Sequence, residues 1–176
     1  MRVASRRSRG DRLLLRVLLG SLCLLTLAVV ASALYRMALY QEAYGYTVLR
    51  VFVDGFELWL GLVIALMLVA GIRLSGRWLA RAALISAAAF TVGFVAMNPD
   101  AWVADRNIDR FEAGRTLDTL YLSTLSADAT PTLVERLPAE VTQCMFGPRD
   151  ITQLTDDALA WHLGRSRALA AVAGSA

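Results

Sequence analysis

The sequence predicts an all-α integral membrane protein with three transmembrane helices, followed by an interfacial helix and a small helical C-terminal tail. Of the 176 residues, 57% are hydrophobic, the mean hydropathy is +0.51, and three long uncharged runs lie before Asn98. This composition is too apolar for an ordinary soluble domain. We therefore divide the chain into a basic arm (1–16), a membrane region (17–98, with spans at about 17–40, 51–72 and 79–98) and an extramembrane tail (99–176).

The first uncharged run has the length of a membrane span. Residues 17–35 form nineteen uncharged positions, which reach about 28 Å as a helix, close to the ~30 Å hydrocarbon core of a bilayer. The small residues Ala31, Ser32 and Ala33 also resemble a signal-peptidase site, so a cleaved signal peptide is the alternative. The run exceeds the usual apolar segment of about 7–15 residues in such peptides, which favours a span.

The second and third runs are shorter. Residues 58–72 give only fifteen uncharged positions, or about 22 Å, so this span must take in charged residues at its ends. Residues 82–97 give sixteen, with Gly93 and several alanines that allow close helix contact.

Arginine counts predict the orientation. Six arginines precede the first span and three separate the second from the third, whereas the segment between the first two spans has only Arg36 and Arg50. The positive-inside rule then places the N-terminus in the cytoplasm and the tail outside, in a multi-pass plasma membrane protein. The N-terminal arginines could also form a nucleic-acid-binding arm, but the apolar run that follows at once favours an anionic membrane surface or a topology signal. We therefore expect the lipid bilayer as a partner and no nucleic acid.

The stretch NPDAWVADRNIDR at 98–110 marks the end of the third span. Asn98 is expected to cap a helix that begins at Pro99, with Asp100 at its positive end and Gly114 as its stop. Trp102 is at the expected place for an interfacial aromatic residue. The apolar residues face lipid or protein in this interpretation, and the charged ones stay in water. The candidate residues of this interfacial motif are Asn98, Pro99, Asp100, Asp105, Arg106, Asn107, Asp109 and Arg110.

The tail is expected to fold as short helices. Apolar residues recur at helical spacing before and after a break near Ser126, and Thr155 begins a last helical pattern with Leu159, Trp161 and Leu163. The prolines and glycine at 131, 138, 147 and 148 are expected to punctuate these helices.

One group of charged residues is a candidate site within the spans. Arg50, Asp54 and Glu57 are spaced i, i+4 and i+7, which places them on one stripe of a helix, and Arg36 would lie at a comparable depth. Ionisable residues inside a bilayer usually face a partner or a water-filled cavity. The alternative is an interfacial salt-bridge set that locks two helices together.

The sequence predicts no catalytic, cofactor-binding or metal site. It has none of the common catalytic motifs, His162 is its single histidine, and Cys23 and Cys144 cannot build a disulfide framework. The tail carboxylates could in principle gather into a cation site or an acid–base pair, but their spacing leaves this open.

Four pieces of the chain resemble a family of bacterial multi-span membrane proteins, domain of unknown function 4173. They are YQEAYGYTVLR at 40–50, NPDAWVADRNIDR at 98–110, LDTLYLSTLSADATP at 117–131 and WHLGRSR at 161–167. The resemblance implies further spans upstream, so the chain is expected to be the C-terminal portion of such a protein, and it supplies no activity. The third piece contains the candidate tail motif, which consists of Asp118, Tyr121, Ser126 and Asp128.

Three functions remain open from the sequence. The first is a non-enzymatic structural or partner-binding membrane protein, whose partners are other membrane-protein chains or the missing upstream spans. The second is a transporter or channel component that uses Arg36, Arg50, Asp54 and Glu57 as a polar path. The third is a membrane enzyme that uses tail carboxylates, which would require Asp100, Asp105 and Asp109 to line one cleft.

Overall fold

The computed structural model describes residues 9–73, 76–150 and 162–175, and these residues form helices and their connections without any strand. The all-α prediction is therefore confirmed. The chain divides into a long-helix unit, Met1–Ala43 with Leu49–Phe94, and a short-helix unit, Tyr44–Val48 with Val95–Ala176. The N-terminal Arg2, Arg6 and Arg7, and the helix start expected at Thr155, lie outside the described residues.

The long-helix unit consists of α1 (Arg9–Tyr44), α2 (Val48–Arg73) and α3 (Leu79–Ala96). Each helix is long and apolar enough to cross a membrane, as the sequence predicts. The first helix begins at Arg9, eight residues before the uncharged run. Leucine and arginine are both strong helix formers, so the helix extends through the charged residues that precede the apolar run.

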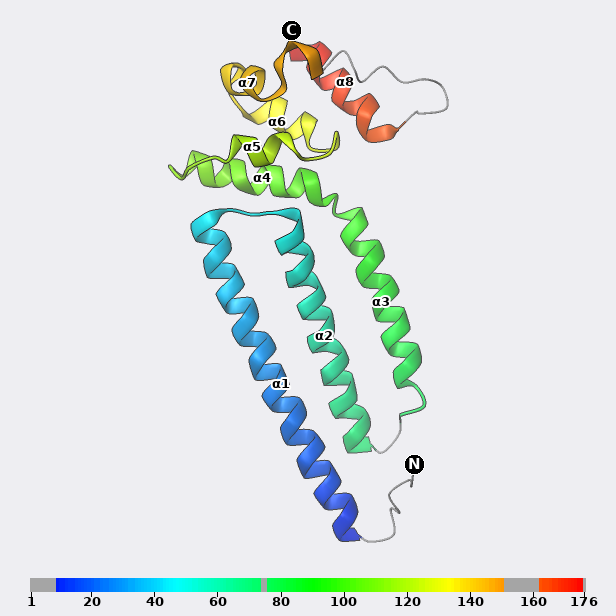
Figure 1. Cartoon of the computed structure of the whole chain (residues 1–176). Helices are drawn as coiled ribbons and strands as arrows, with labels where there is room; N and C mark the ends of the chain where they lie inside the picture. The colour runs from blue at the N-terminus through cyan, green and yellow to red at the C-terminus, as the bar shows by residue number, and fades with distance from the viewer. Residues whose placement is uncertain (1–8, 74–75, 151–161, 176) are drawn as a thin grey trace. The chain divides into compact units, whose positions relative to one another are not determined.

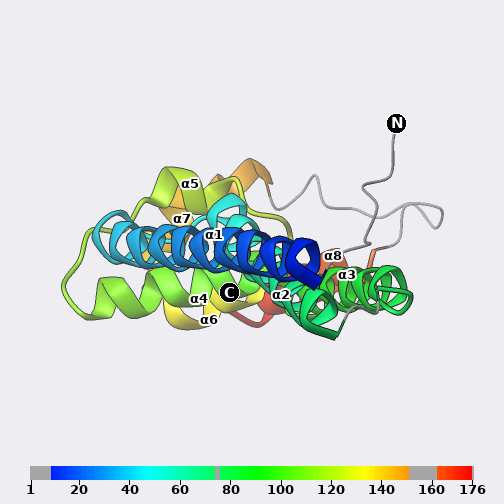
Figure 2. The same ribbon diagram turned by 90° about the horizontal axis from the view of Figure 1, so that it is seen from below.

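In this unit α2 lies between α1 and α3, and the three helices form a single layer (Figures 1 and 2). A Cβ atom at Gly61 would lie 3.5 Å from Val30 of α1, whereas the Trp59 indole N–H donates to the Ser86 hydroxyl of α3 at 3.2 Å. At 100° per residue, Gly61 and Trp59 point about 160° apart. One side of α2 therefore faces α1 and the opposite side faces α3.

An aromatic cluster joins α2 to α3. Phe52 meets the Phe94 ring edge-on at 5.4 Å and lies 6.0 Å from Phe90. Gly55 makes room for this packing, because a Cβ atom there would lie 2.8 Å from Phe90 Cε2. Most other large apolar side chains of the three helices remain exposed, and α3 has no buried residue. Such surfaces suit hydrocarbon or other membrane helices.

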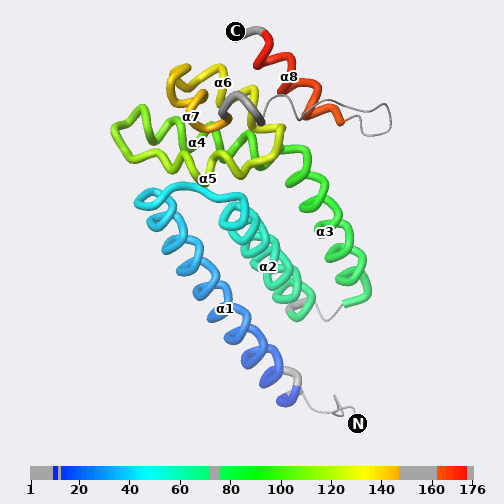
Figure 3. Tube along the Cα trace, turned by 45° about the horizontal axis from the view of Figure 1, so that its top comes forward, coloured from blue at the N-terminus to red at the C-terminus, as the bar shows by residue number. Residues whose placement is uncertain are grey.

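The short-helix unit consists of α4 (Pro99–Glu112), α5 (Thr119–Ser123), α6 (Thr130–Arg136), α7 (Ala139–Asp150) and α8 (Leu163–Ser175). Its helix α6 packs against both α4 and α8 (Figures 1 and 3). All the apolar residues of its core cluster are at most 5% exposed, and they are Ala104, Ile108, Leu122, Ala129, Leu133 and Leu137. The apolar side of α4 is thus buried by protein.

The start of α4 differs from the expected cap. The helix begins at Pro99 as predicted, but Asn98 has φ 53° and ψ 76° and its side chain makes no capping hydrogen bond. Capping residues usually have extended backbone geometry, which aims the side chain at the first free N–H groups. Asparagine instead tolerates the left-handed conformation that turns the chain between α3 and α4.

Glycine and proline are expected to end helices at Gly114 and at 147–148, and the structure confirms the first of these ends. Gly114 ends α4 as predicted, with φ +81° and a hydrogen bond from the Arg115 N–H to the Arg110 carbonyl, the pattern of a left-handed helix cap. The expected break at 147–148 is wrong, because α7 continues to Asp150. Pro148 lies in the last turn of α7, where it removes a single backbone donor.

Candidate functional site

The side chain of Asn107 on α4 holds the loop between α1 and α2, which belongs to the short-helix unit. This residue is 8% exposed. Its Oδ1 accepts a hydrogen bond from the Tyr46 N–H at 3.0 Å, and its Nδ2 donates to the carbonyls of Tyr46 and Val103, both at 2.9 Å. The amide therefore satisfies both backbone groups of Tyr46, as a neighbouring β-strand would.

Three further contacts complete this loop clamp, which we define as Gly45, Tyr46, Asn107 and Tyr121. The Val48 N–H donates to the Tyr121 hydroxyl at 2.8 Å. Gly45 has φ +91°, and a Cβ atom there would lie 2.8 Å from Asn107 Oδ1 and from Arg110 Nη1. The Tyr46 ring meets Trp102 edge-on at 5.5 Å. Three of the sequence pieces noted above thus meet at one place.

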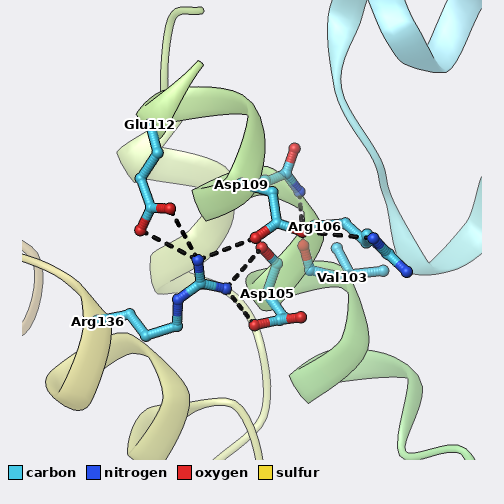
Figure 4. A network of polar contacts seen from close by, with 7 residues as sticks. Val103, Asp105, Arg106, Asp109, Glu112 and Arg136 are labelled. Atoms are coloured by element: carbon cyan, nitrogen blue, oxygen red, sulfur yellow. Dashed lines mark hydrogen bonds and ion pairs between the residues drawn. The ribbon is translucent and has the colours of Figure 1, made fainter. Parts of the chain in front are cut away.

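A second polar network joins α4 to α6 around Arg136 (Figure 4). Its guanidinium donates to Asp105, to Asp109 at 2.9 Å and to both oxygens of Glu112 at 3.0 Å. The hydrogen bonds that the guanidinium donates to Asp109 and Asp105 raise the pKa of Arg136 above its ordinary value. All four side chains are more than a quarter exposed, so salt screens these pairs.

The sequence reasoning missed Arg136 as the partner of these acids. The signal was present, because Asp105, Asp109 and Glu112 are spaced i, i+4 and i+7 and therefore share one side of α4. That pattern predicts a basic partner on a neighbouring helix but does not say which arginine supplies it.

The other acidic candidates serve local structure. Ser126 donates its N–H to Asp100 Oδ1 at 3.4 Å, and Asp118 caps α5 by accepting from the Tyr121 N–H at 2.9 Å. A Cβ atom at Gly164 would lie 2.0 Å from Asp128 Oδ1, so the first turn of α8 packs directly on that carboxylate.

These positions do not bring Asp100 together with Asp105 and Asp109, which the enzyme hypothesis requires. Asp100 and Asp109 lie about 180° apart around α4. Within the described ranges, no group of three His, Cys, Asp or Glu side chains could hold a metal ion.

The charged residues of the long-helix unit are only partly brought together. Gln41 of α1 donates to Asp54 Oδ2 at 2.5 Å, and the Arg50 guanidinium lies 4.8 Å above the Tyr40 ring. Asp54 Oδ1 and Glu57 Oε2 are buried and have no hydrogen-bond partner among the described residues. Arg36 is exposed and points about 140° away from Gln41 around α1. Gln41 is thus the partner that sequence reasoning missed.

Comparison with known proteins identifies the family. The chain matches the family model described as Domain of unknown function (DUF4153) over residues 1–136. This is a different family from number 4173, which the four pieces suggested, although both are of unknown function. The matched region includes α1 to α6 and the whole loop clamp, whereas the fourth piece at 161–167 lies beyond it. No curated protein and no solved structure matches the chain. The chain belongs to the family Domain of unknown function (DUF4153).

Proposed function

We propose that the protein is a non-enzymatic structural or partner-binding protein of the plasma membrane. Its N-terminus is cytoplasmic and its short-helix unit lies outside the cytoplasm. Three apolar helices support the membrane location, and the arginine distribution supports the orientation. The proposed partner is another membrane-protein chain that binds the short-helix unit.

A binding role is supported by one observation: the polar motif residues make contacts within the short-helix unit and order it. Asn107 and Tyr121 bind the backbone of the α1–α2 loop, and Arg136 joins α4 to α6. These contacts order a set of short helices whose α5 is too short to be stable alone. An ordered surface lowers the entropy cost of binding a partner.

Leu120 offers a position from which to test partner binding. It is 79% exposed, the largest value among the exposed large apolar side chains. A photo-crosslinking amino acid at position 120 should give one discrete, saturable adduct in native membranes. The matched control is the same amino acid at Gln143, an exposed position on α7. This control should give a lower yield of the adduct. If both positions give no adduct and the chain purifies as a lone monomer, the proposal fails.

A second candidate function is transport, which one observation favours. Asp54 and Glu57 lie on the side of α2 that faces α1, and each has a buried carboxylate oxygen without a hydrogen-bond donor among the described residues. Unpaired acceptors of this kind are costly in a bilayer, and the ionisable residues found there usually mark an ion or substrate pathway. Reconstituted chain should then mediate ion flux in liposomes. Flux that is unaffected by Asp54→Asn combined with Glu57→Gln would exclude this path.

A further inference from the structure

Tyr46, Trp102 and Arg106 follow one another in a row at the α1–α2 loop, and we refer to this row as the stack. The Tyr46 ring meets Trp102 edge-on at 5.5 Å, and the Arg106 guanidinium lies 5.3 Å from the centre of the Trp102 ring. Arg106 points about 160° away from Ile108, which is fully buried in the core. In Figure 4 it lies on the side of α4 away from Arg136. The stack therefore presents a guanidinium on the outer side of α4.

The chain connections place this stack at the end of the spans. Tyr46 belongs to the short loop that joins α1 to α2, and Trp102 follows the last residue of α3, Ala96, by six positions. When three consecutive helices cross a bilayer, the first loop and the end of the third helix lie on the same side of it. Both anchors of the stack are thus close to one membrane surface, where tryptophan and tyrosine are enriched.

The guanidinium of Arg106 makes one long hydrogen bond within the described part of the protein. Its partner is Asp109, at 3.4 Å, and both side chains are more than 40% exposed. Asp109 accepts a shorter bond, 2.9 Å, from Arg136 with its other carboxylate oxygen. Arg106 therefore makes a single hydrogen bond, at 3.4 Å, and its remaining N–H donors have no partner among the described residues. A guanidinium has five N–H donors in a planar fork that matches phosphate oxygens. The Trp102 ring, 5.3 Å from the guanidinium carbon, attracts this charge and keeps it beside the ring.

We propose that Arg106, held on Trp102, binds the phosphate of a membrane lipid and anchors the short-helix unit to the bilayer surface. An anionic lipid fits best, because its net charge complements the guanidinium. The inference rests on the three helices crossing the bilayer. It does not depend on which protein, if any, the short-helix unit binds.

The test measures lipid binding to the full chain in detergent. Phosphatidylglycerol is titrated into wild-type protein and into Arg106→Gln, and bound lipid is counted by native mass spectrometry. The affinity of the tightest site should fall about fivefold in Arg106→Gln, which corresponds to about 1 kcal/mol for one basic side chain at an anionic membrane surface. Arg106→Lys should fall between the two, because it keeps the charge but loses the stacked fork.

Matched controls separate the possible outcomes. Arg167 is an exposed arginine of α8, so Arg167→Gln removes the same charge and should leave the affinity unchanged. An equal loss in both variants would reveal nonspecific charge attraction and overturn the proposal, as would no loss in Arg106→Gln. Displacement of the lipid by millimolar inorganic phosphate would show a free-anion site and overturn the lipid assignment.

An independent measurement covers the case in which Arg106→Gln does not fold. A chain with Trp59→Phe, Trp78→Phe and Trp161→Phe keeps Trp102 as its single tryptophan. In vesicles, its fluorescence should be quenched more by a nitroxide at the lipid headgroup than by aqueous iodide. The reverse order would place the stack away from the membrane and refute the proposal.

Discussion

Replacing Asn107 with alanine should release the α1–α2 loop from α4. The substitution removes both hydrogen bonds to the Tyr46 backbone, at 3.0 and 2.9 Å. A hydrogen bond contributes about 0.5–1.5 kcal/mol net, and a buried group left without a partner costs about 1–3 kcal/mol. Because water can reach into the space left by the smaller side chain, we take the loss in local stability as about 2–3 kcal/mol.

Hydrogen exchange at the Tyr46 amide measures this loss directly. Each loss of about 1.4 kcal/mol raises the opening equilibrium constant tenfold. The exchange rate of this amide should therefore rise about 30- to 140-fold in Asn107→Ala. The amide of Leu137, which donates to the Leu133 carbonyl in the core, should exchange as in the wild type. Asn107→Asp keeps an acceptor for the Tyr46 N–H and should retain part of its protection. Unchanged exchange at Tyr46 in Asn107→Ala would refute the reasoning.

Three further substitutions test separate contacts. Gly164→Ala would bring a Cβ atom to 2.0 Å from Asp128 Oδ1, so the amides of α8 should lose hydrogen-exchange protection. Adding Asp128→Ala should restore this protection, and failure of the rescue would mean that another contact docks α8. Arg136→Met should lower the melting temperature, because three carboxylates lose their shared donor. The difference in melting temperature between wild type and variant should shrink at 1 M salt, where the Debye length falls to about 3 Å; an equal difference at low salt and at 1 M salt would contradict an electrostatic cause. Gly55→Ala would place a Cβ atom 2.8 Å from Phe90 and should lower the melting temperature of the full chain in detergent; Phe90→Leu should reverse this, and a neutral Gly55→Ala would show that the ring has room to move.

The sequence predicts the long helices well because the signal is additive along each run. Many apolar residues contribute to each of 17–35, 58–72 and 82–97, so no single contact decides the outcome. The exact ends are less predictable. The start of α1 at Arg9 follows from helix propensity, whereas the uncharged run at Val17 marks the entry into hydrocarbon.

The candidate site is less predictable because it depends on pairs far apart in the chain. Asn107 is one polar residue in a charged motif, and its role depends on Tyr46, which is 61 positions away. Arg136 and Gln41 form comparable long-range pairs with α4 and with Asp54. A single sequence shows such residues but cannot show which of them meet.

The labelling of Cys144 tests whether the apolar helices span the membrane and place the short-helix unit outside. The reagent must be one that does not cross membranes. Cys144 is exposed on α7, whereas Cys23 is buried in α1. Intact cells are treated with a membrane-impermeant maleimide and compared with permeabilised cells, with Cys144→Ser as the control. Cys144 should be labelled in intact cells. Labelling only after permeabilisation would contradict it and place the short-helix unit in the cytoplasm.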